Sequence, residues 1–181
     1  MSAIDLVATL QQGLWQRWSD PLQTISFTKK QSDYIQAAAT HTESAMRAAN
    51  KNGKSVVGGA LAVAFARGDR QLKGVDLPLF RRPTIGWAMT RTYKQQTEGT
   101  QAALQLALGT WPHVISWENR AEGIWSAVWV RPRGHSDNDP QTWSKIALVS
   151  QHASKNDADN AKGARLDWVW FDEPGYPAVM R

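Results

Sequence analysis

The tripeptide Gly53-Lys54-Ser55 is the feature that most restricts how this chain can fold. An apolar run rich in glycine and alanine follows it over residues 56–67 and ends at Gly68, as expected of a helix. A loop of this kind is the second half of a phosphate-binding loop, because its backbone N–H groups and the positive end of the helix dipole attract an anion. In such a loop Lys54 reaches the β and γ phosphates of a nucleotide, and the Ser55 hydroxyl holds Mg²⁺.

The loop departs from the full phosphate-binding pattern at one position. That pattern has a glycine five residues before Gly53, where this chain has Ala48. Because a Gly-Lys-Ser tripeptide also arises by chance, the segment alone is equally consistent with a helix start that carries an exposed lysine.

A second segment favours the nucleotide interpretation. Residues 166–171 read LDWVWF, which is typical of a buried strand, and the acidic pair Asp172-Glu173 follows directly. Ligands of open α/β sheets bind at the carboxyl ends of the strands. There Asp172 would hold Mg²⁺, directly or through water, and Glu173 would polarise the water that attacks the γ-phosphate. The alternative is a strand that stops at a solvated acidic turn, but both motifs in this order favour a P-loop ATPase.

Composition is consistent with one domain that has a sizeable core, since the chain has 181 residues. Lys and Arg number 21 and Asp and Glu 16, and the net charge of +5 permits a polyanionic partner without requiring one. The absence of cysteine excludes disulfides and thiolate metal sites and fits a reducing compartment. Residues 1–20 lack the apolar centre of a secretory signal, and no apolar stretch is long enough for a membrane span, so no membrane association is expected.

Ten tryptophans are many for this length. They would either pack in the core or stack on nucleic-acid bases. Because Lys and Arg do not cluster around them, packing is the favoured interpretation.

The predicted elements alternate along the chain. An amphipathic helix is expected over residues 3–18, packed on the domain or on a neighbouring subunit. The further expectations are strands at 25–28, 46–49, 84–89, 124–131, 145–150 and 166–171, and helices at 31–46, 56–67 and 93–108. Strand 46–49 conflicts with the helix preference of its alanines. The alternation predicts a three-layer α/β domain with a mainly parallel sheet over residues 28–181, after an N-terminal helical segment at 1–27.

Four segments together resemble the ATPase domain of the large terminase subunit, the DNA-packaging motor of tailed bacteriophages. They are the loop at 49–55, strand 84–89 with helix 97–108, the glycine-containing turn at 161–165 and the acidic strand at 166–174. The resemblance spans residues 28–177. That family often lacks the first loop glycine, which would account for Ala48. The fold it implies is the three-layer P-loop NTPase fold, of the ASCE or RecA-like type.

The resemblance also implies roles for individual residues. The loop residues Asn50, Asn52, Gly53, Lys54 and Ser55 would bind ATP, Ser55 and Asp172 would hold Mg²⁺, and Glu173 would be the catalytic glutamate. Lys51 lies where many members carry a basic residue that senses or stabilises the γ-phosphate. Gln31 is placed to read adenine, although a surface amide is an equal alternative. Arg47 would be a basic finger acting within or between subunits.

The activity implied is ATP hydrolysis that drives double-stranded DNA into a procapsid, in the cytoplasm of the infected bacterial host. The implied partners are DNA, the portal protein, the small terminase subunit and further copies of the chain in a ring. Family members continue beyond the acidic Walker B strand with further strands and a nuclease domain, whereas this sequence ends at Arg181. The expectation is therefore a domain truncated after Walker B, without nuclease activity.

Two other functions use the same sequence features. A helicase-like DNA translocase would use the loop and the acids in the same way. A non-catalytic DNA-binding or assembly module would instead rely on basic residues such as Arg81, Arg82, Arg131 and Arg133 to contact phosphates. The alternative for these arginines is that they are ordinary loop residues.

Overall fold

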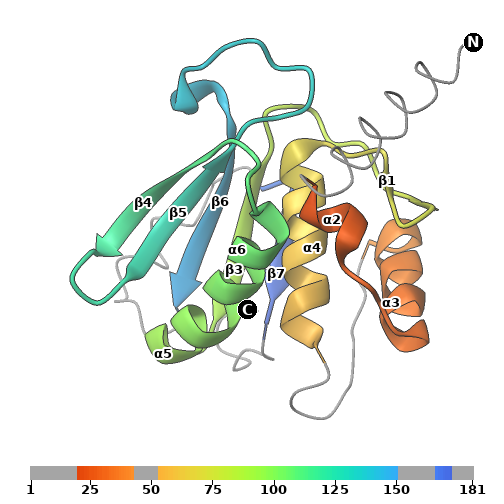
Figure 1. Ribbon diagram of the computed structural model, residues 1–181, viewed down its shortest axis with the longest axis horizontal. Coiled ribbons are helices and arrows are strands. Elements are labelled where there is room, and N and C mark those ends of the chain that lie inside the picture. Colours follow the sequence, from red (N-terminus) through yellow and green to blue (C-terminus); the bar gives the residue numbers. More distant parts are fainter. Residues whose placement is uncertain (1–19, 43–52, 151–165, 173–181) are drawn as a thin grey trace, which may run out of the picture.

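A five-stranded mixed sheet organises the chain, whose computed structural model describes residues 20–42, 53–150 and 166–172. The strand order is β4-β5-β6-β3-β7 (Figure 1). The strands are β3 (Ile85–Thr90), β4 (His113–Asn119), β5 (Ile124–Val130), β6 (Ser144–Ser150) and β7 (Trp168–Phe171). Strand β3 lies between β6 and β7 and is parallel to both, whereas β4, β5 and β6 pair antiparallel. The expected α/β class is thus confirmed, but the sheet is mixed rather than mainly parallel.

The antiparallel half arises from a hairpin that the sequence pattern did not reveal. Strand β4 follows the Trp111-Pro112 break and returns through a turn that contains Gly123 at φ +69°. The Asn119 side chain closes this turn by accepting hydrogen bonds from the backbone N–H groups of Ala121 and Glu122. A register shift after Ser116 interrupts the alternation of β4, which explains why periodicity alone missed this strand.

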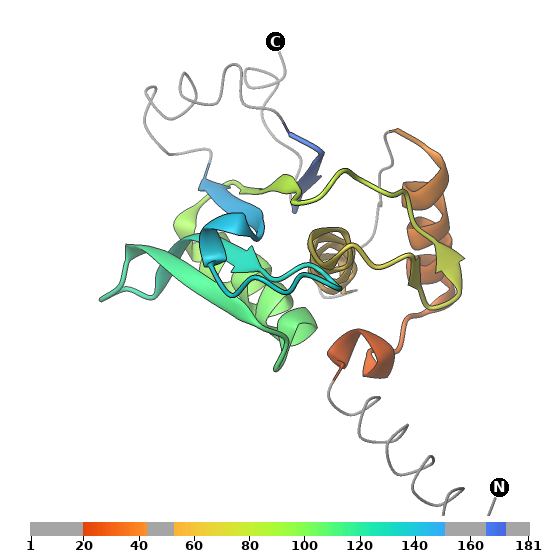
Figure 2. The same cartoon turned by 90° about the horizontal axis from the view of Figure 1, so that it is seen from above.

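The helices pack on one face of the sheet. They are α2 (Pro21–Thr24), α3 (Lys29–Thr40), α4 (Lys54–Arg67), α5 (Tyr93–Gln95), the π-helix η1 (Gln96–Gln101) and α6 (Ala102–Leu108). Two short pieces, the hairpin β1 (Gln71–Leu72) with β2 (Val75–Asp76) and the 3₁₀ turn η2 (Pro140–Thr142), complete the described residues. Figure 2 shows α4 end-on between α3 and the sheet, with α6 beside it. No described α-helix covers the opposite face, so the described residues form two of the three expected layers.

Helix α4 is the centre of the core. Ten of its fourteen residues are buried, because it contacts the sheet on one side and α3 and α6 on others. A Cβ atom on Gly58 would lie 2.2 Å from the Trp170 indole of β7, and one on Gly59 would lie 2.9 Å from Ala103 of α6. These two glycines therefore allow β7 and α6 to approach the helix closely. The predicted helix over 56–67 and its stop at Gly68, which has φ +67°, are confirmed.

Several other predicted elements are confirmed within a residue or two, namely strands 84–89, 124–131, 145–150 and 166–171. The strand expected at 25–28 is wrong, since Ile25 caps α2 and Thr28 is the N-cap residue of α3. The helix expected at 31–46 corresponds to α3, which ends earlier, at Thr40. The continuous helix expected at 93–108 is instead α5, η1 and α6 in succession. Helix 3–18 and strand 46–49 lie outside the described residues.

Candidate nucleotide-binding site

The N-terminus of α4 begins at Gly53, which adopts a left-handed conformation with φ +69°. A side chain at this position would be strained, and its Cβ would lie 2.6 Å from Gln31 Nε2. Gly53 supplies no side-chain cap, and the first turn contains no acidic residue. The positive end of the helix dipole is therefore not neutralised by a carboxylate of its own first turn, which suits an external anion.

Gln31 joins α3 to this loop. Its Oε1 accepts a hydrogen bond from the Thr28 backbone N–H at 2.7 Å, as part of a capping box, and its Nε2 donates to the Gly53 carbonyl at 3.3 Å. The residue is buried, with 7% of its surface exposed. These bonds give Gln31 a role in holding the loop against α3, while its contact with adenine stays a prediction.

Ser55 and Asp172 both lie close to Gly99 of η1. Ser55 is in the first turn of α4, and Asp172 follows β7, where its backbone N–H donates to the Met89 carbonyl of β3 at 3.0 Å. A Cβ atom placed on Gly99 of η1 would lie 3.2 Å from Asp172 Oδ2 and 3.8 Å from Ser55 Oγ. The two oxygens, from segments far apart in the sequence, are thus both within 4 Å of one point.

The π-helix η1 carries three buried polar residues, Gln96, Thr100 and Gln101. The Thr100 hydroxyl donates to Asp172 Oδ2 at 3.0 Å. Gln96 Nε2 donates to the Trp125 carbonyl at 2.7 Å, and Gln101 Oε1 accepts from the Trp125 backbone N–H at 3.0 Å. These bonds fix η1 against β5 and so fix the wall that Gly99 and Thr100 form beside Asp172.

This wall was not anticipated from the sequence. The segment QQTEGTQ reads as a polar stretch of an ordinary helix, and nothing in its composition marks a π-turn. The one usable signal is Gly99 itself, because an isolated glycine inside a helical pattern often has a packing or functional reason.

The residues present fit Mg²⁺ carried by a nucleotide better than a metal held by protein alone. Among the residues described, no three His, Asp or Glu side chains gather into a metal-binding group. Mg²⁺ in nucleotide sites needs one or two carboxylates, with substrate phosphates and water completing its octahedron. The Ser55 hydroxyl and the Asp172 carboxylate supply such a partial set, and a side chain on Gly99 would contact both oxygens.

Comparison with protein families, curated proteins and solved structures finds no match to this chain.

The structure brings together the described members of the predicted site at one end of α4. Gly53 is the N-cap residue of α4, Lys54 and Ser55 are its first two residues, and Gln31 bonds to the Gly53 carbonyl. Asp172 and Ser55 both lie close to Gly99. The other predicted site residues, Arg47, Asn50, Lys51, Asn52 and Glu173, lie outside the described residues.

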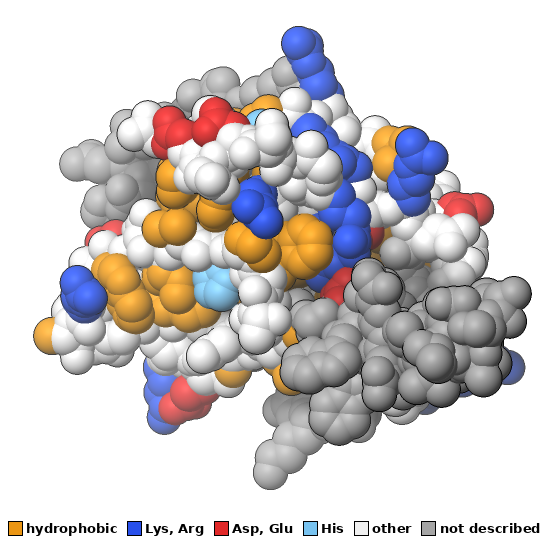
Figure 3. All heavy atoms as spheres, turned by 45° about the horizontal axis from the view of Figure 1, so that its top comes forward, with side chains coloured by type: hydrophobic (Ala, Val, Ile, Leu, Met, Phe, Trp, Pro, Cys, Tyr) orange, Lys and Arg blue, Asp and Glu red, His pale blue; other side chains and the backbone are white. Residues whose placement is uncertain are grey.

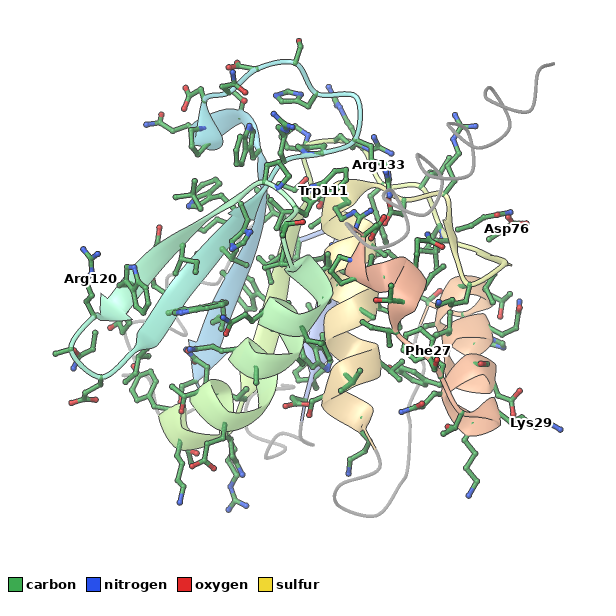
Figure 4. The ribbon with its side chains drawn as sticks, in the orientation of Figure 1. Phe27, Lys29, Asp76, Trp111, Arg120 and Arg133 are labelled. Atoms are coloured by element: carbon green, nitrogen blue, oxygen red, sulfur yellow. The ribbon has the colours of Figure 1, made fainter. Side chains whose placement is uncertain are left out.

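A second polar cluster lies at the opposite end of α4. The fully buried Arg67 binds both carboxylate oxygens of Asp20, at 2.8 and 2.5 Å, and lies 3.2 Å from Asp69. Arg133 pairs with the same two aspartates, and both guanidinium groups lie over the Trp111 ring, 4.0 and 4.8 Å from its centroid. Figure 4 shows Trp111 and Arg133 together at this end.

The ionisation of this cluster follows from burial and pairing. Burial alone would raise the pKa of Asp20, but the hydrogen bonds and charges of Arg67 and Arg133 outweigh it and lower that pKa below 3.8. For Asp69 burial prevails over the same arginines, and its pKa is raised. Burial would lower the pKa of Arg133, yet its bonds to Asp69 and Asp20 raise it.

The arginines considered as phosphate contacts are largely engaged in this region. Arg82 donates to the carbonyls of Gly68 and Arg133, and Arg131 donates to Asn138 at 3.3 Å. Figure 3 shows Lys and Arg side chains gathered on this end of the molecule, which comes forward in that view. Their bonds give Arg82 and Arg133 a structural role before any contact with a polyanion.

Within the ranges that the structure describes, no helix is both long and apolar enough to cross a membrane.

Proposed function

We propose that this chain binds ATP together with Mg²⁺ at the N-terminus of α4 and hydrolyses the bond between its β- and γ-phosphates. The observation that carries the proposal is the convergence of Ser55 Oγ and Asp172 Oδ2 on one point beside Gly99. A hydroxyl in the first turn of a loop-helix unit and a carboxylate directly after a strand are the two Mg²⁺ ligands of P-loop NTPases. An ordinary exposed helix start would not require a carboxylate that is held in place by a buried hydroxyl, as Thr100 holds Asp172.

Each residue has a defined task in this proposal. The backbone of the loop and the Lys54 ammonium bind the phosphates, which places the nucleotide at the positive end of α4. Ser55 and Asp172 hold Mg²⁺, which when bound neutralises charge on the phosphates. Glu173, the next residue after Asp172, orients the attacking water and accepts its proton.

The resemblance in motif order extends the proposal to a terminase-type motor. In that role ATP hydrolysis would move double-stranded DNA into a procapsid, with the chain in a ring on the portal protein and in contact with the small terminase subunit. The host cytoplasm is the corresponding location. A helicase-like translocase uses the same site, and unwinding of a DNA duplex in place of simple translocation would distinguish it.

The non-catalytic DNA-binding module has less support. It relies on basic residues such as Arg81, Arg82, Arg131 and Arg133, and three of these are bonded to the protein: Arg82 and Arg133 around Gly68 and Asp69, and Arg131 to Asn138. It also gives no reason for Asp172 and Ser55 both to lie close to Gly99.

The proposal is tested by Mg²⁺-dependent ATP turnover in the parent and in Glu173→Gln. We expect Glu173→Gln to bind ATP as the parent does and to lose turnover by about 100-fold or more, because removing a general base costs about 10²–10⁴-fold. Glu122→Gln, in the exposed β4–β5 turn, is the matched control and should keep parental turnover. A parent without turnover, or a Glu173→Gln protein that no longer binds ATP, would contradict the role assigned to Glu173.

A further inference from the structure

The π-helix η1 meets Asp172 through two adjacent residues. A Cβ atom on Gly99 would lie 3.2 Å from Asp172 Oδ2. The Thr100 hydroxyl donates a hydrogen bond to the same oxygen at 3.0 Å. Single π-turns are rare and occur frequently at functional sites. Here the turn places Gly99, which has no side chain, and the hydrogen-bond donor Thr100 next to the Asp172 carboxylate.

Thr100 is built into the core. Its side chain is completely buried, and the neighbouring Gln96 and Gln101 tie the same turn to β5 and to the Gly123 carbonyl. Thr100 therefore cannot reorient freely. A hydrogen bond to an ionised carboxylate is stronger than one between neutral groups, so this bond holds the orientation of Asp172.

We propose that Thr100 is a positioning residue for Asp172 and that it sets the affinity of the site for Mg²⁺. The hydroxyl holds the carboxylate next to Gly99, where a Cβ atom would lie 3.2 Å from Asp172 Oδ2 and 3.8 Å from Ser55 Oγ. Outer-shell partners of metal ligands commonly change metal affinity by about 10–100-fold when they are removed. This inference rests on the proposed nucleotide function, because the cation in question is the one that accompanies ATP.

The test is the Mg²⁺ concentration that gives half-maximal binding of an ATP analogue with a fluorophore on its ribose. Thr100→Val removes the hydroxyl and keeps the branched shape. We expect it to raise this Mg²⁺ midpoint by about 10–100-fold. Binding of the analogue in EDTA should stay within about twofold of the parent, because the backbone and Lys54 act on the phosphates without the metal. Thr100→Ser restores the hydroxyl and should return the midpoint to within about threefold of the parent.

A control variant comes from the same π-helix. Thr97 donates its hydroxyl only to the backbone carbonyls of Tyr93 and Lys94. Thr97→Val therefore removes a comparable hydroxyl from η1 without touching Asp172, and it should leave the Mg²⁺ midpoint unchanged.

Gly99→Ala provides a second, independent variant. The new methyl group would lie 3.2 Å from Asp172 Oδ2 and 3.8 Å from Ser55 Oγ, so it should also raise the Mg²⁺ midpoint. The melting temperature is measured alongside, because the added helix propensity of alanine opposes the cost of the close contact with Asp172. Lower metal affinity in a protein of equal or higher stability is an effect that general damage to the fold would not produce.

The outcomes separate this inference from the function on which it rests. A Thr100→Val protein with the parental midpoint, or one that weakens binding equally with and without Mg²⁺, overturns the positioning role and leaves nucleotide binding in place. If Thr100→Val does not fold, Thr100→Ala, which also lacks the hydroxyl, takes its place, and a parental Mg²⁺ midpoint in that variant overturns the positioning role. A parent that binds no ATP analogue in either condition overturns the proposed function, and the positioning role with it.

Discussion

Single residues at the two ends of α4 decide what each end can do. At its C-terminal end Arg67 is completely buried, and its charge is balanced by Asp20 and Asp69, so this end serves stability. Near its N-terminal end, neither Gly53 nor Gly99 of η1 has a side chain, and Gly99 lies close to the Ser55 hydroxyl and the Asp172 carboxylate. Ion pairs thus balance the charge at the C-terminal end of α4, whereas no carboxylate of the first turn neutralises the N-terminal end, which can bind an anion.

The pH dependence of stability tests the ion pairs of Asp20 at the C-terminal end of α4. The lowered pKa of Asp20 means that its carboxylate form stabilises the fold. This contribution is fully present above the unfolded pKa of about 3.8 and is lost as the pH falls through the lower folded pKa. Asp20→Asn keeps a side chain able to cap α2, but it loses the ion pairs and should be about 3 kcal/mol less stable at neutral pH.

Urea denaturation between pH 7 and pH 3 provides the measurement for this prediction. The free energy of unfolding of the parent should approach that of Asp20→Asn below about pH 4. Two curves that stay parallel down to pH 3 would contradict the assigned ionisation of Asp20.

Part of the site could be predicted at the residue scale, because short motifs carry chemistry that does not depend on the rest of the fold. Lys54, Ser55 and Asp172 were predicted in this way, and in the described residues Ser55 and Asp172 both lie close to Gly99. Thr100 could not be found, since its role depends on the three-dimensional approach of η1 to β7. Gln31 shows the same limit: its capping box with Thr28 is a local pattern, but its bond to Gly53 requires the fold.

At the scale of elements, α4 is fitted closely to its neighbours. The glycine pair inside it allows the Trp170 indole of β7 and the backbone of α6 to pack against the helix. Periodicity predicted this helix because its apolar run is long and ends at a glycine in the left-handed conformation. The same method missed the π-turn, because a single wider turn hardly changes the apolar spacing of residues 93–108.

Gly58→Ala tests this fit. A Cβ atom at 2.2 Å from the Trp170 ring forces atoms apart, and overpacking of a core typically costs about 1–3 kcal/mol. We expect a net loss of about 1–2 kcal/mol in the free energy of unfolding, since alanine recovers some helix propensity. Thermal and urea denaturation would measure it.

The partner variant Trp170→Phe identifies the cause of that loss. A smaller ring makes room for the added methyl, so the double variant should be more stable than the sum of the two single changes predicts. If Gly58→Ala is as stable as the parent, or if the two changes are simply additive, the close packing of α4 on β7 is not what limits this position.

Across the whole molecule, the parallel and antiparallel halves of the sheet have different roles. Strands β3 and β7 run parallel, and β7 brings Asp172 to their carboxyl edge, where α4 begins (Figure 1). The hairpin of β4 and β5 extends the sheet on the other side and supplies the backbone groups that hold η1. The sequence pattern predicted the parallel half through its apolar runs, whereas the mixed sheet depended on a strand with interrupted alternation.

Calorimetric titration with ATP and Mg²⁺ measures whether α4 begins at a nucleotide site. We expect the parent to bind ATP, Lys54→Ala to lose this binding, and Lys29→Ala, altered at an exposed lysine on α3 (Figure 4), to retain it. A parent that binds no ATP, or one that binds it no better than Lys54→Ala, would show that α4 does not begin at such a site.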